Sequence, residues 1–381
     1  MISRADAANT PRLNSLLIVR LSAMGDIIHT LPAVTVLRRA FPHATLGWLI
    51  EDRWAELLCT LRYPRSGSKS PERPLVDRVH TVNLSQWRGA LLSINTLQQI
   101  AVGLSELRGV KYDVAVDFQG AVRSALLALW CGSQTRFGDA QPRENAASMF
   151  YTRQVETTGR HVVEQALDLA RAVIEKTAGV EGSAEFVGFS PVRETPAAEF
   201  PVDPDAEKKI ACQIEGVTDF AILNPGAGWG AKQWPPERYA AVARELGGDG
   251  IRSLVNFGPG EEELASAVES ASAGSARKIS CSISELVSLT RRARLLIGGD
   301  TGPMHLAAAL KVPVVAIFGP TNPARNGPFG TRSIVLRSAS SLTDHSRRAE
   351  PELGLLEISP EEVVTAARKL LHGLPTESRV S

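Results

Sequence analysis

The sequence predicts an α/β protein made of two doubly wound domains, each built on a parallel sheet. Short apolar runs typical of buried strands alternate with helical patterns about every 25–30 residues. This alternation stops in a stretch rich in Pro, Glu, Gly and Ser, residues 180–205, and then starts again. With 381 residues, the chain is long enough to bury two sizeable cores.

In the first half, the strand Ser15–Arg20 runs into a turn at Gly25, and apolar residues then follow helical spacing. Further strands are expected at Thr45–Ile50, Val79–Leu84 and Tyr112–Asp117, and further helices at Arg53–Leu61, Leu91–Leu107, after Gln119 and at Gly159–Lys176. Residues 62–74, rich in Pro, Ser and Arg, predict a mobile basic loop.

The second half repeats the pattern. Strands are expected at Phe220–Asn224, Ser253–Phe257, Leu295–Ile297 and Val312–Phe318, and helices at Glu237–Leu246, Glu261–Ala271, Ile283–Arg292 and Ser359–His372. The last helix opens with capping chemistry in Ser359-Pro360-Glu361-Glu362. We therefore predict domains over residues 1–190 and 200–355, followed by a helix and tail over 356–381.

Composition limits the class of protein. The 42 basic and 41 acidic residues leave a net charge of +1, so bulk charge gives no case for nucleic acid. No apolar run reaches the roughly 18–20 residues that span a bilayer, and the first residues lack the apolar core of a signal peptide. The four cysteines are scattered and do not suggest a zinc site. We expect a cytoplasmic protein.

The stretch Leu295–Ala309 carries the first functional signal. Its strand ends at Gly298-Gly299, and Asp300-Thr301-Gly302-Pro303 then opens a helix. Unpaired backbone N–H groups at a helix N-terminus favour phosphate. Two further glycine-bearing loops, 225–232 and 257–262, also follow strands.

Because ligands of open α/β sheets bind at the carboxyl ends of the strands, these three loops can converge on one ligand. Lys232 can neutralise a phosphate, Glu261 or Glu262 can bind a ribose diol, and Thr301 and Gly302 can offer N–H groups to a diphosphate. The first turn of the chain lacks GxGxxG, which argues against a dinucleotide site. The pattern favours a nucleotide sugar bound between the two domains.

These segments resemble the ADP-heptose:lipopolysaccharide heptosyltransferases, glycosyltransferase family 9. The segments that carry the resemblance are residues 19–34, 116–126, 224–240, 257–263, 298–310 and 314–323. The HTLPA version of the first segment is more similar to heptosyltransferase I than to heptosyltransferase II. The resemblance implies a GT-B fold, in which two Rossmann-like doubly wound domains face each other across a cleft, and a C-terminal helix that packs back toward the N-terminal domain.

The resemblance also implies roles for individual residues. Asp26 matches the proposed general base, although a carboxylate there also suits a helix N-terminus. Lys232 matches the lysine near the donor diphosphate, and Glu261 the acid that binds ribose, with Glu262 as the alternative in a shifted register. The residues that match the donor motif for sugar hydroxyls and phosphates are Asp300, Thr301, Gly302 and His305. For His305, a helix cap or a core histidine is the alternative.

The implied reaction is inverting transfer from ADP-heptose to the Kdo region of a lipid A precursor, without a covalent intermediate. No DxD-type motif stands out, so we expect no metal and no cofactor. Arg88, Arg123 and Arg143 are candidates for binding the acceptor's carboxylates and phosphates, or else are solvated surface arginines. The enzyme is expected to act peripherally at the inner face of the inner membrane.

Other functions stay open at this point. They are heptosyltransferase II or a related transferase with another acceptor, a nucleotide-sugar epimerase of GT-B type, and a non-catalytic binder. The chain departs from the family pattern at Ala227-Gly228, where hydroxyl residues are common, and in residues 62–74 and 338–352, which match nothing in it. These departures bear on acceptor and sugar specificity more than on the chemistry.

Overall fold

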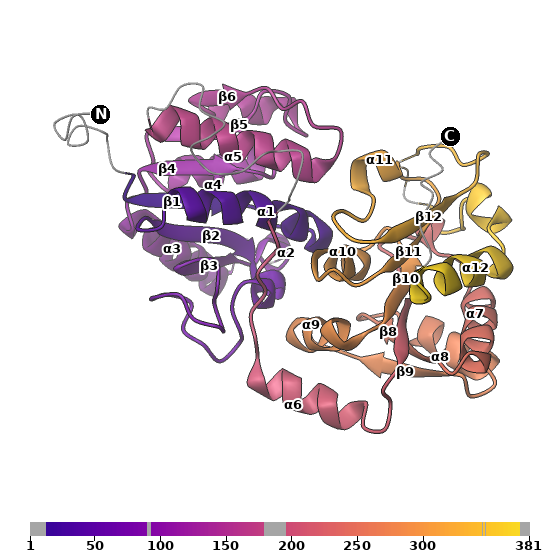
Figure 1. The fold of residues 1–381 in the computed structure, drawn as a ribbon. Helices are drawn as coiled ribbons and strands as arrows, with labels where there is room; N and C mark the ends of the chain where they lie inside the picture. The colour runs from indigo at the N-terminus through magenta and orange to yellow at the C-terminus, as the bar shows by residue number, and fades with distance from the viewer. Residues whose placement is uncertain (1–12, 90–92, 179–195, 345, 347, 374–381) are drawn as a thin grey trace, which may run out of the picture. The chain divides into compact units, whose positions relative to one another are not determined.

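The structure is a computed structural model that describes residues 13–89, 93–178, 196–344, 346 and 348–373 (Figure 1). The chain divides into two compact units, Met1–Val202 and Asp203–Ser381. This division falls inside the stretch, residues 180–205, where the sequence placed the domain boundary. Part of that stretch, residues 179–195, lies outside the described residues.

The first unit is built on a six-stranded parallel sheet with the order β3-β2-β1-β4-β5-β6. Its strands are β1 (Ser15–Val19), β2 (Thr45–Glu51), β3 (Arg78–Val82), β4 (Val114–Asp117), β5 (Thr135–Asp139) and β6 (Arg153–Val155). Every residue of β1 is buried, as expected for a central strand with helices on both faces. The short strands β5 and β6 were not predicted, because their polar residues give no apolar run.

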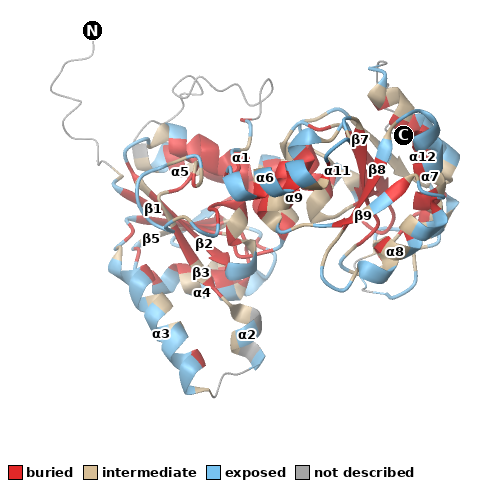
Figure 2. Ribbon diagram, turned by 90° about the horizontal axis from the view of Figure 1, so that it is seen from below, coloured by how far each residue is buried: buried red, intermediate tan, exposed pale blue. Residues whose placement is uncertain are grey.

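Helices cover both faces of this sheet (Figures 1 and 2). They are α1 (Met24–Ala40), α2 (Leu84–Gly89), α3 (Ile94–Gly109), α4 (Val122–Trp130) and α5 (Val162–Ala178), with the 3-10 turns η2 (Asp52–Leu57) and η3 (Asn145–Phe150). α1 packs against α5, whereas α3 and α4 share a core cluster on the other side of the sheet. The helix predicted at Arg53–Leu61 is the shorter η2.

The loop of residues 62–74 is organised around Arg73, which is completely buried. Its guanidinium donates hydrogen bonds to the backbone oxygens of Pro64, Ser68 and Val76. The burial of this basic side chain was not predicted, and the mobility of the loop stays a prediction. Composition alone does not distinguish a solvated arginine from one that binds backbone carbonyls.

The second unit repeats the architecture with the sheet order β12-β11-β10-β7-β8-β9. Its strands are β7 (Phe220–Asn224), β8 (Arg252–Phe257), β9 (Ala276–Ser280), β10 (Leu295–Gly299), β11 (Val314–Phe318) and β12 (Ser333–Arg337). Alternate residues of β10 enter different cores: Leu295 and Ile297 join one cluster and Leu296 the other. This alternation explains why the strand is apolar throughout.

The helical elements of the second unit lie on both faces of its sheet. They are α6 (Pro204–Gln213), α7 (Pro236–Gly248), α8 (Glu262–Ala271), α9 (Ile283–Arg292), α10 (Gly302–Ala309), α11 (Pro323–Asn326) and α12 (Pro360–Leu371), with η4 (Gly230–Lys232) and η5 (Gly354–Glu357). α6 and α10 contact α9, and α7 contacts both α8 and α12.

The last helix, α12, belongs to the second unit. Its buried residues, among them Val363 and Leu370, join the cluster beneath α7, and Trp234 Nε1 donates to the Ile358 oxygen just before the helix at 3.1 Å. The sequence prediction set this helix apart as a segment that packs toward the first domain. Its buried apolar residues pack within the second unit, and packing toward the first unit stays a prediction.

Candidate active site

The carboxyl ends of β7 and β10 form the centre of the candidate donor site. The chain passes from β7 to β8 and β9 on one side, and then returns to β10 on the other side of β7. Such a point of reversal separates the two loops that follow the strands and is where open α/β sheets bind ligands. Lys232 ends η4 after β7, and Asp300 follows β10 directly.

Lys232 and Asp300 form a nearly buried ion pair. The Lys232 Nζ lies 2.6 Å from Asp300 Oδ2, and the two side chains are 13% and 7% exposed. The other carboxylate oxygen, Oδ1, lies 3.1 Å from His305 Nε2. Burial raises the pKa of Asp300, but the hydrogen bond and charge of His305, and then Lys232, outweigh it and hold that pKa well below its usual range. Asp300 is therefore an anion that fixes the side chains of Lys232 and His305.

Thr301 and Gly302 open α10 at this edge. Thr301 is the N-cap and Gly302 the first helical residue, with Pro303 in the first turn. Asn224 Nδ2 donates to the Thr301 hydroxyl at 3.3 Å and so joins the end of β7 to the start of α10. His305 is 5% exposed, and its contact with Asp300 places it inside the predicted donor motif. Its role toward a sugar stays a prediction.

Glu261, rather than Glu262, faces the glycine loops. Its Oε2 accepts a hydrogen bond from Gly258 N at 2.9 Å, and a Cβ added at Gly226 would lie 2.2 Å from its carboxylate. Glu262 is exposed and pairs with Lys278 at 3.0 Å on the outer side of α8. The geometry thus favours Glu261 as the acid next to a bound nucleotide.

Two asparagines at strand ends were missed by the sequence analysis. Asn256 Nδ2 donates to Asn224 Oδ1 at 2.7 Å, and Asn224 Nδ2 donates to Gly226 O at 3.1 Å. Both side chains are buried. This chain of amides fixes the loops after β7 and β8 relative to Thr301. The signal that could have found them is an amide residue at the last positions of two apolar strands.

The segment 348–352 is hydrogen-bonded to the loop that carries Lys232. Ala231 N donates to Arg348 O at 3.1 Å, and Glu352 N donates to Ala231 O at 3.2 Å. At Gly230, an added Cβ would lie 1.5 Å from the Ala349 oxygen, so a side chain there would force the segments apart. Residues 338–352 matched nothing in the family pattern, but their last part supports the Lys232 loop.

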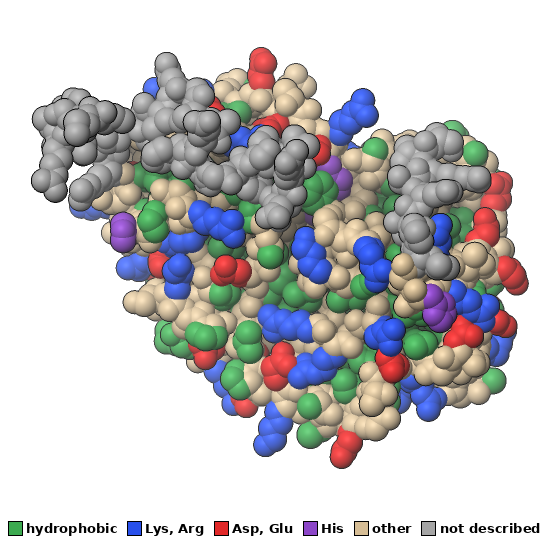
Figure 3. Space-filling view, viewed as in Figure 1, with side chains coloured by type: hydrophobic (Ala, Val, Ile, Leu, Met, Phe, Trp, Pro, Cys, Tyr) green, Lys and Arg blue, Asp and Glu red, His purple; other side chains and the backbone are tan. Residues whose placement is uncertain are grey.

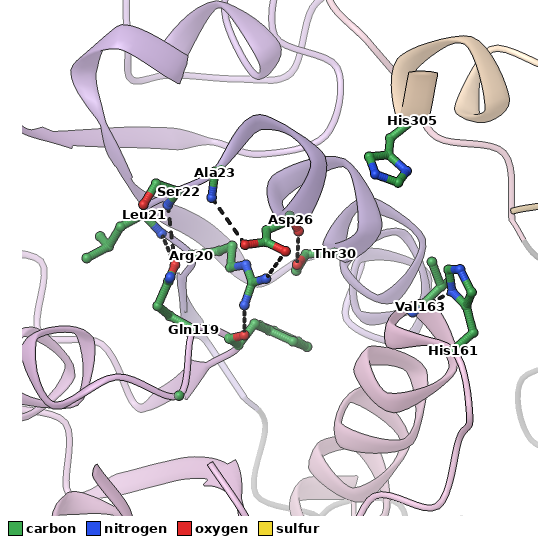
Figure 4. Close-up of polar contacts among 12 residues, drawn as sticks. Arg20, Leu21, Ser22, Ala23, Asp26, Thr30, Gln119, His161, Val163 and His305 are labelled. Carbon is green, nitrogen blue, oxygen red and sulfur yellow. Dashed lines mark hydrogen bonds and ion pairs between the residues drawn. The ribbon is translucent and has the colours of Figure 1, made fainter. Parts of the chain in front are cut away.

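In the first unit, Asp26 lies on the first turn of α1, directly after β1. Arg20 Nη2 contacts its Oδ1 at 3.0 Å, and Ala23 N donates to its Oδ2 at 3.3 Å (Figure 4). The Asp26 side chain is 39% exposed, so the carboxylate is accessible. It therefore fills the role of a helix N-terminal carboxylate, and its role as general base stays a prediction.

Residues after β4 hold this turn in place. Gln119 Oε1 accepts hydrogen bonds from Leu21 N and Ser22 N at 3.1 and 3.3 Å, and Phe118 O accepts one from Arg20 (Figure 4). Beneath them, burial raises the pKa of Asp117, although Tyr151 and Ser124 donate hydrogen bonds to its carboxyl group. Asp117 was not among the predicted site residues.

The three arginines proposed for the acceptor have different positions. Arg123 lies exposed in the first turn of α4, and Arg143 lies exposed in the loop whose backbone approaches Gly120. Both therefore flank the loop after β4, and neither forms an ion pair within the described residues. Arg88 belongs to α2, and its side chain lies outside the described residues.

The model of the family described as glycosyltransferase family 9 (heptosyltransferase) matches residues 104–355, more than half of the chain. The chain belongs to glycosyltransferase family 9. As a member of this family it is a glycosyltransferase. The matched range includes the first unit from residue 104 onward and every donor-site residue described above.

Curated relatives carry the same family name. Lipopolysaccharide heptosyltransferase 1 of Pseudomonas aeruginosa is 28% identical over 326 residues, which cover 84% of this chain and 83% of the relative. The protein of that name in Escherichia coli K12 is 28% identical over 84% of this chain and 93% of its own length. Both similarities extend beyond the matched range of the family model.

Solved structures of the family share the fold. The Escherichia coli heptosyltransferase WaaC with ADP is 25% identical, with a TM-score of 0.71 over 93% of this chain and 99% of that chain. A family 9 enzyme from Veillonella parvula is 22% identical with a TM-score of 0.74 over 95% and 98% of the two chains. The predicted GT-B fold of the family 9 glycosyltransferases is confirmed.

Proposed function

We propose that the chain transfers heptose from ADP-heptose to the Kdo region of a lipopolysaccharide precursor. The observation that carries this proposal is the Lys232–Asp300 pair at the reversal point of the second sheet, in a chain of family 9. A similar structure, WaaC, has been solved with ADP and with ADP-2-deoxy-2-fluoro heptose. The relatives named lipopolysaccharide heptosyltransferase 1 support the same choice of sugar and product.

The donor diphosphate is assigned to Lys232 and the N-terminus of α10. The ammonium of Lys232 is oriented by Asp300, and the first amides of α10 carry the positive end of the helix dipole. Both can take up the negative charge that grows on the leaving ADP. Glu261 is assigned to the ribose hydroxyls. These assignments require no metal ion.

The acceptor side is assigned to the first unit. An acceptor hydroxyl attacks the anomeric carbon, the bond from that carbon to the diphosphate oxygen breaks, and ADP leaves with the bonding pair. Asp26 takes the proton of the attacking hydroxyl as general base. Arg20 acts as a positioning residue, because its guanidinium is held by Phe118 O and contacts the Asp26 carboxylate.

The proposed acceptor is an amphiphile with carboxylate and phosphate groups, so the reaction would take place at the inner face of the inner membrane. Exposed Arg123 and Arg143 suit those anionic groups, because a guanidinium can bind a carboxylate or phosphate with two parallel hydrogen bonds. No helix among the described residues is long and apolar enough to cross a membrane. We propose peripheral association because the proposed acceptor is itself anchored in the membrane.

An assay of ADP release tests the function. The chain is incubated with ADP-heptose alone, with ADP-heptose and Kdo-lipid A, and with ADP-heptose and an acceptor that already carries the first heptose. The proposal is supported if ADP is released fast in the incubation with ADP-heptose and Kdo-lipid A and slowly in the other two. Release that requires the heptosylated acceptor would assign the chain to the second transfer instead, and conversion of the donor without any acceptor would replace transfer by epimerisation or hydrolysis.

A further inference from the structure

Half of the exposed large hydrophobic side chains in the described residues lie on two helices of the first unit. Twelve such side chains are exposed, and six of them belong to α3 and α4. We call these six the apolar face: Ile94, Leu97, Val102, Leu126, Leu129 and Trp130. Figure 2 shows α3 mostly in the colour of exposed residues, on the side of the sheet opposite α1 and α5. Such a concentration marks a surface that contacts another apolar phase.

On α3, the exposed apolar residues form a stripe. Ile94, Leu97 and Ala101 are spaced i, i+3 and i+7, so they share one side of the helix, while Leu107 is 1% exposed on the other. Moreover, no charged residue occurs on α3 before Glu106. A helix that merely faces water normally carries charges on its outer side. The two buried residues of α3 are Thr96 and Leu107, and its exposed side is largely uncharged.

On α4, the spacing repeats. Leu126, Leu129 and Trp130 follow i, i+3 and i+4, while Ala125 and Ala128 are buried. Trp130 is 48% exposed. A tryptophan that keeps its ring half in water is typical of membrane–water interfaces, where the ring is apolar and the indole N–H can remain hydrated.

The two helices pack on the same side of the sheet and approach each other at their C-terminal ends. Leu107 of α3 and Ala128 of α4 belong to the same core cluster, so both helices pack on the same side of the sheet. Their C-terminal ends approach each other, because an added Cβ at Gly132 would lie 3.9 Å from Arg108 Cγ. The apolar residues of α3 and α4 therefore point away from a shared core.

The charges that border the apolar face are mainly positive. Arg108 and Lys111 lie exposed at the end of α3, and Arg123 and Arg143 lie exposed around the start of α4. The acidic residues among them are Glu106 on α3 and Glu144, whose carboxylate accepts a hydrogen bond from Val122 N at 2.8 Å. Basic residues around an exposed apolar surface complement an anionic lipid surface. The rest of the molecule has no such bias in its overall composition, and Figure 3 shows basic and acidic side chains interspersed over the face in view.

We propose that the apolar face of α3 and α4 docks the chain on an anionic phospholipid bilayer, with its apolar side chains among the acyl chains near the headgroups and its basic border on the phosphates. This inference rests on the proposed function, because it supposes an acceptor anchored in the membrane. Arg123, assigned to the acceptor, lies on α4 itself. Docking through α4 thus brings the bilayer and the acceptor's anionic groups to the same helix.

Co-sedimentation with vesicles tests the proposal without any acceptor glycolipid. The full chain is mixed with vesicles of phosphatidylethanolamine and phosphatidylglycerol, and separately with vesicles of phosphatidylcholine alone. We expect sedimentation with the anionic vesicles and little with the neutral ones. Two variants, Leu97→Gln with Val102→Gln, and Leu126→Gln with Leu129→Gln, should each lower the partition coefficient by about tenfold or more, because apolar area is no longer removed from water.

The matched control is Leu342→Gln with Leu353→Gln, two exposed leucines of the second unit, which should bind vesicles like the unmodified chain. All variants should release ADP normally with a deacylated, water-soluble Kdo acceptor. The proposal is overturned if the chain stays in the supernatant of anionic vesicles, or if the face variants bind as the control does. It is also overturned if the chain is a dimer that the face variants dissociate, since a second copy then covers the face.

The two proposals can fail separately. Vesicle binding that depends on the apolar face, without ADP release from any acceptor, would leave the docking surface standing and remove the proposed reaction. Normal transfer to the soluble acceptor, without vesicle binding, would support the proposed reaction and remove the docking surface.

Discussion

Lys232 and Asp300 lie 68 positions apart in the chain and meet at 2.6 Å, one on the loop after β7 and the other on the loop after β10. Their contact joins the two loops at the point where the sheet order reverses. Because Asp300 also contacts His305, removing the carboxylate leaves two cationic or polar groups without their shared partner. Removing Lys232 leaves Asp300 with His305.

This asymmetry predicts how the pair responds to substitution. Asp300→Asn should lower the free energy of unfolding of the second unit by an amount on the order of 3–5 kcal/mol, which is typical when one partner of a buried ion pair is removed. Lys232→Gln should lower it less. Both should weaken ADP binding, and the double variant should lose less than the two single losses combined. Calorimetric titration with ADP and urea unfolding measure these effects. Strictly additive losses would show that the pair does not act as a unit.

Asp26→Asn should lower kcat by roughly 10²–10⁴, the usual contribution of a positioned base. ADP binding should hardly change, since the donor residues belong to the other unit. The matched control is Asp52→Asn, another aspartate of the first unit that pairs with an arginine, Arg65, at 2.9 Å on the surface. Near-normal turnover of Asp26→Asn would leave Asp26 with the role of a helix N-terminal charge alone.

Two glycines of one loop should differ sharply when each is replaced by alanine. A Cβ at Gly226 would lie 2.2 Å from the Glu261 carboxylate, whereas a Cβ at Gly228 would meet nothing within 4 Å. Gly226→Ala should therefore displace Glu261 and raise the KM for ADP-heptose, and Gly228→Ala should not. Steady-state kinetics with saturating acceptor provide the comparison. Equal KM values would argue against Glu261 as a donor-binding residue.

His80 predicts a pH dependence of stability. It is buried beside Tyr112, whose hydroxyl lies 2.8 Å from Nε2, and burial, followed by the charge of Arg78, lowers the pKa of His80 to about 4. Because the unfolded chain binds this proton near pH 6.5, the folded state loses stability as the pH falls from about 6.5 toward 4. The loss between pH 7.5 and 5 should be about 2 kcal/mol.

Urea unfolding at the two pH values, followed through the first unit, measures this loss. His80→Gln should be less stable at pH 7.5 but should show a smaller difference between the two pH values. The same pH difference in both proteins would mean that another group is responsible.

Activity should survive chelation by EDTA. Lys232 and the N-terminus of α10 are assigned to the charge of the leaving diphosphate, so a metal ion has no required role in the proposed step. ADP release is measured before and after dialysis against the chelator. A loss that magnesium or manganese restores would show that the diphosphate is bound through a metal.

The sequence predicted the central strands because they are apolar on both faces, as in β1, β7 and β10. It placed the candidate donor residues in glycine loops that follow such strands, whereas the roles of Asp300 and His305 came from the resemblance to the family and stay predictions. It could not predict that Arg73 is buried, since its partners are backbone oxygens of its own loop. Nor could it predict the support of the Lys232 loop by residues 348–352, because backbone hydrogen bonds between distant segments leave no pattern in side-chain type.

The bond from Trp234 Nε1 to Ile358 O spans 124 positions of the chain, and the Ala231 contacts with residues 348 and 352 span nearly as many. During translation, the first unit is complete before synthesis of the second begins, so its sheet can form on the ribosome from a contiguous segment. The Lys232 loop can reach this support only after residues 348–358 have been synthesised. The candidate donor site of the second unit therefore takes its final form later in synthesis than the sheet of the first unit.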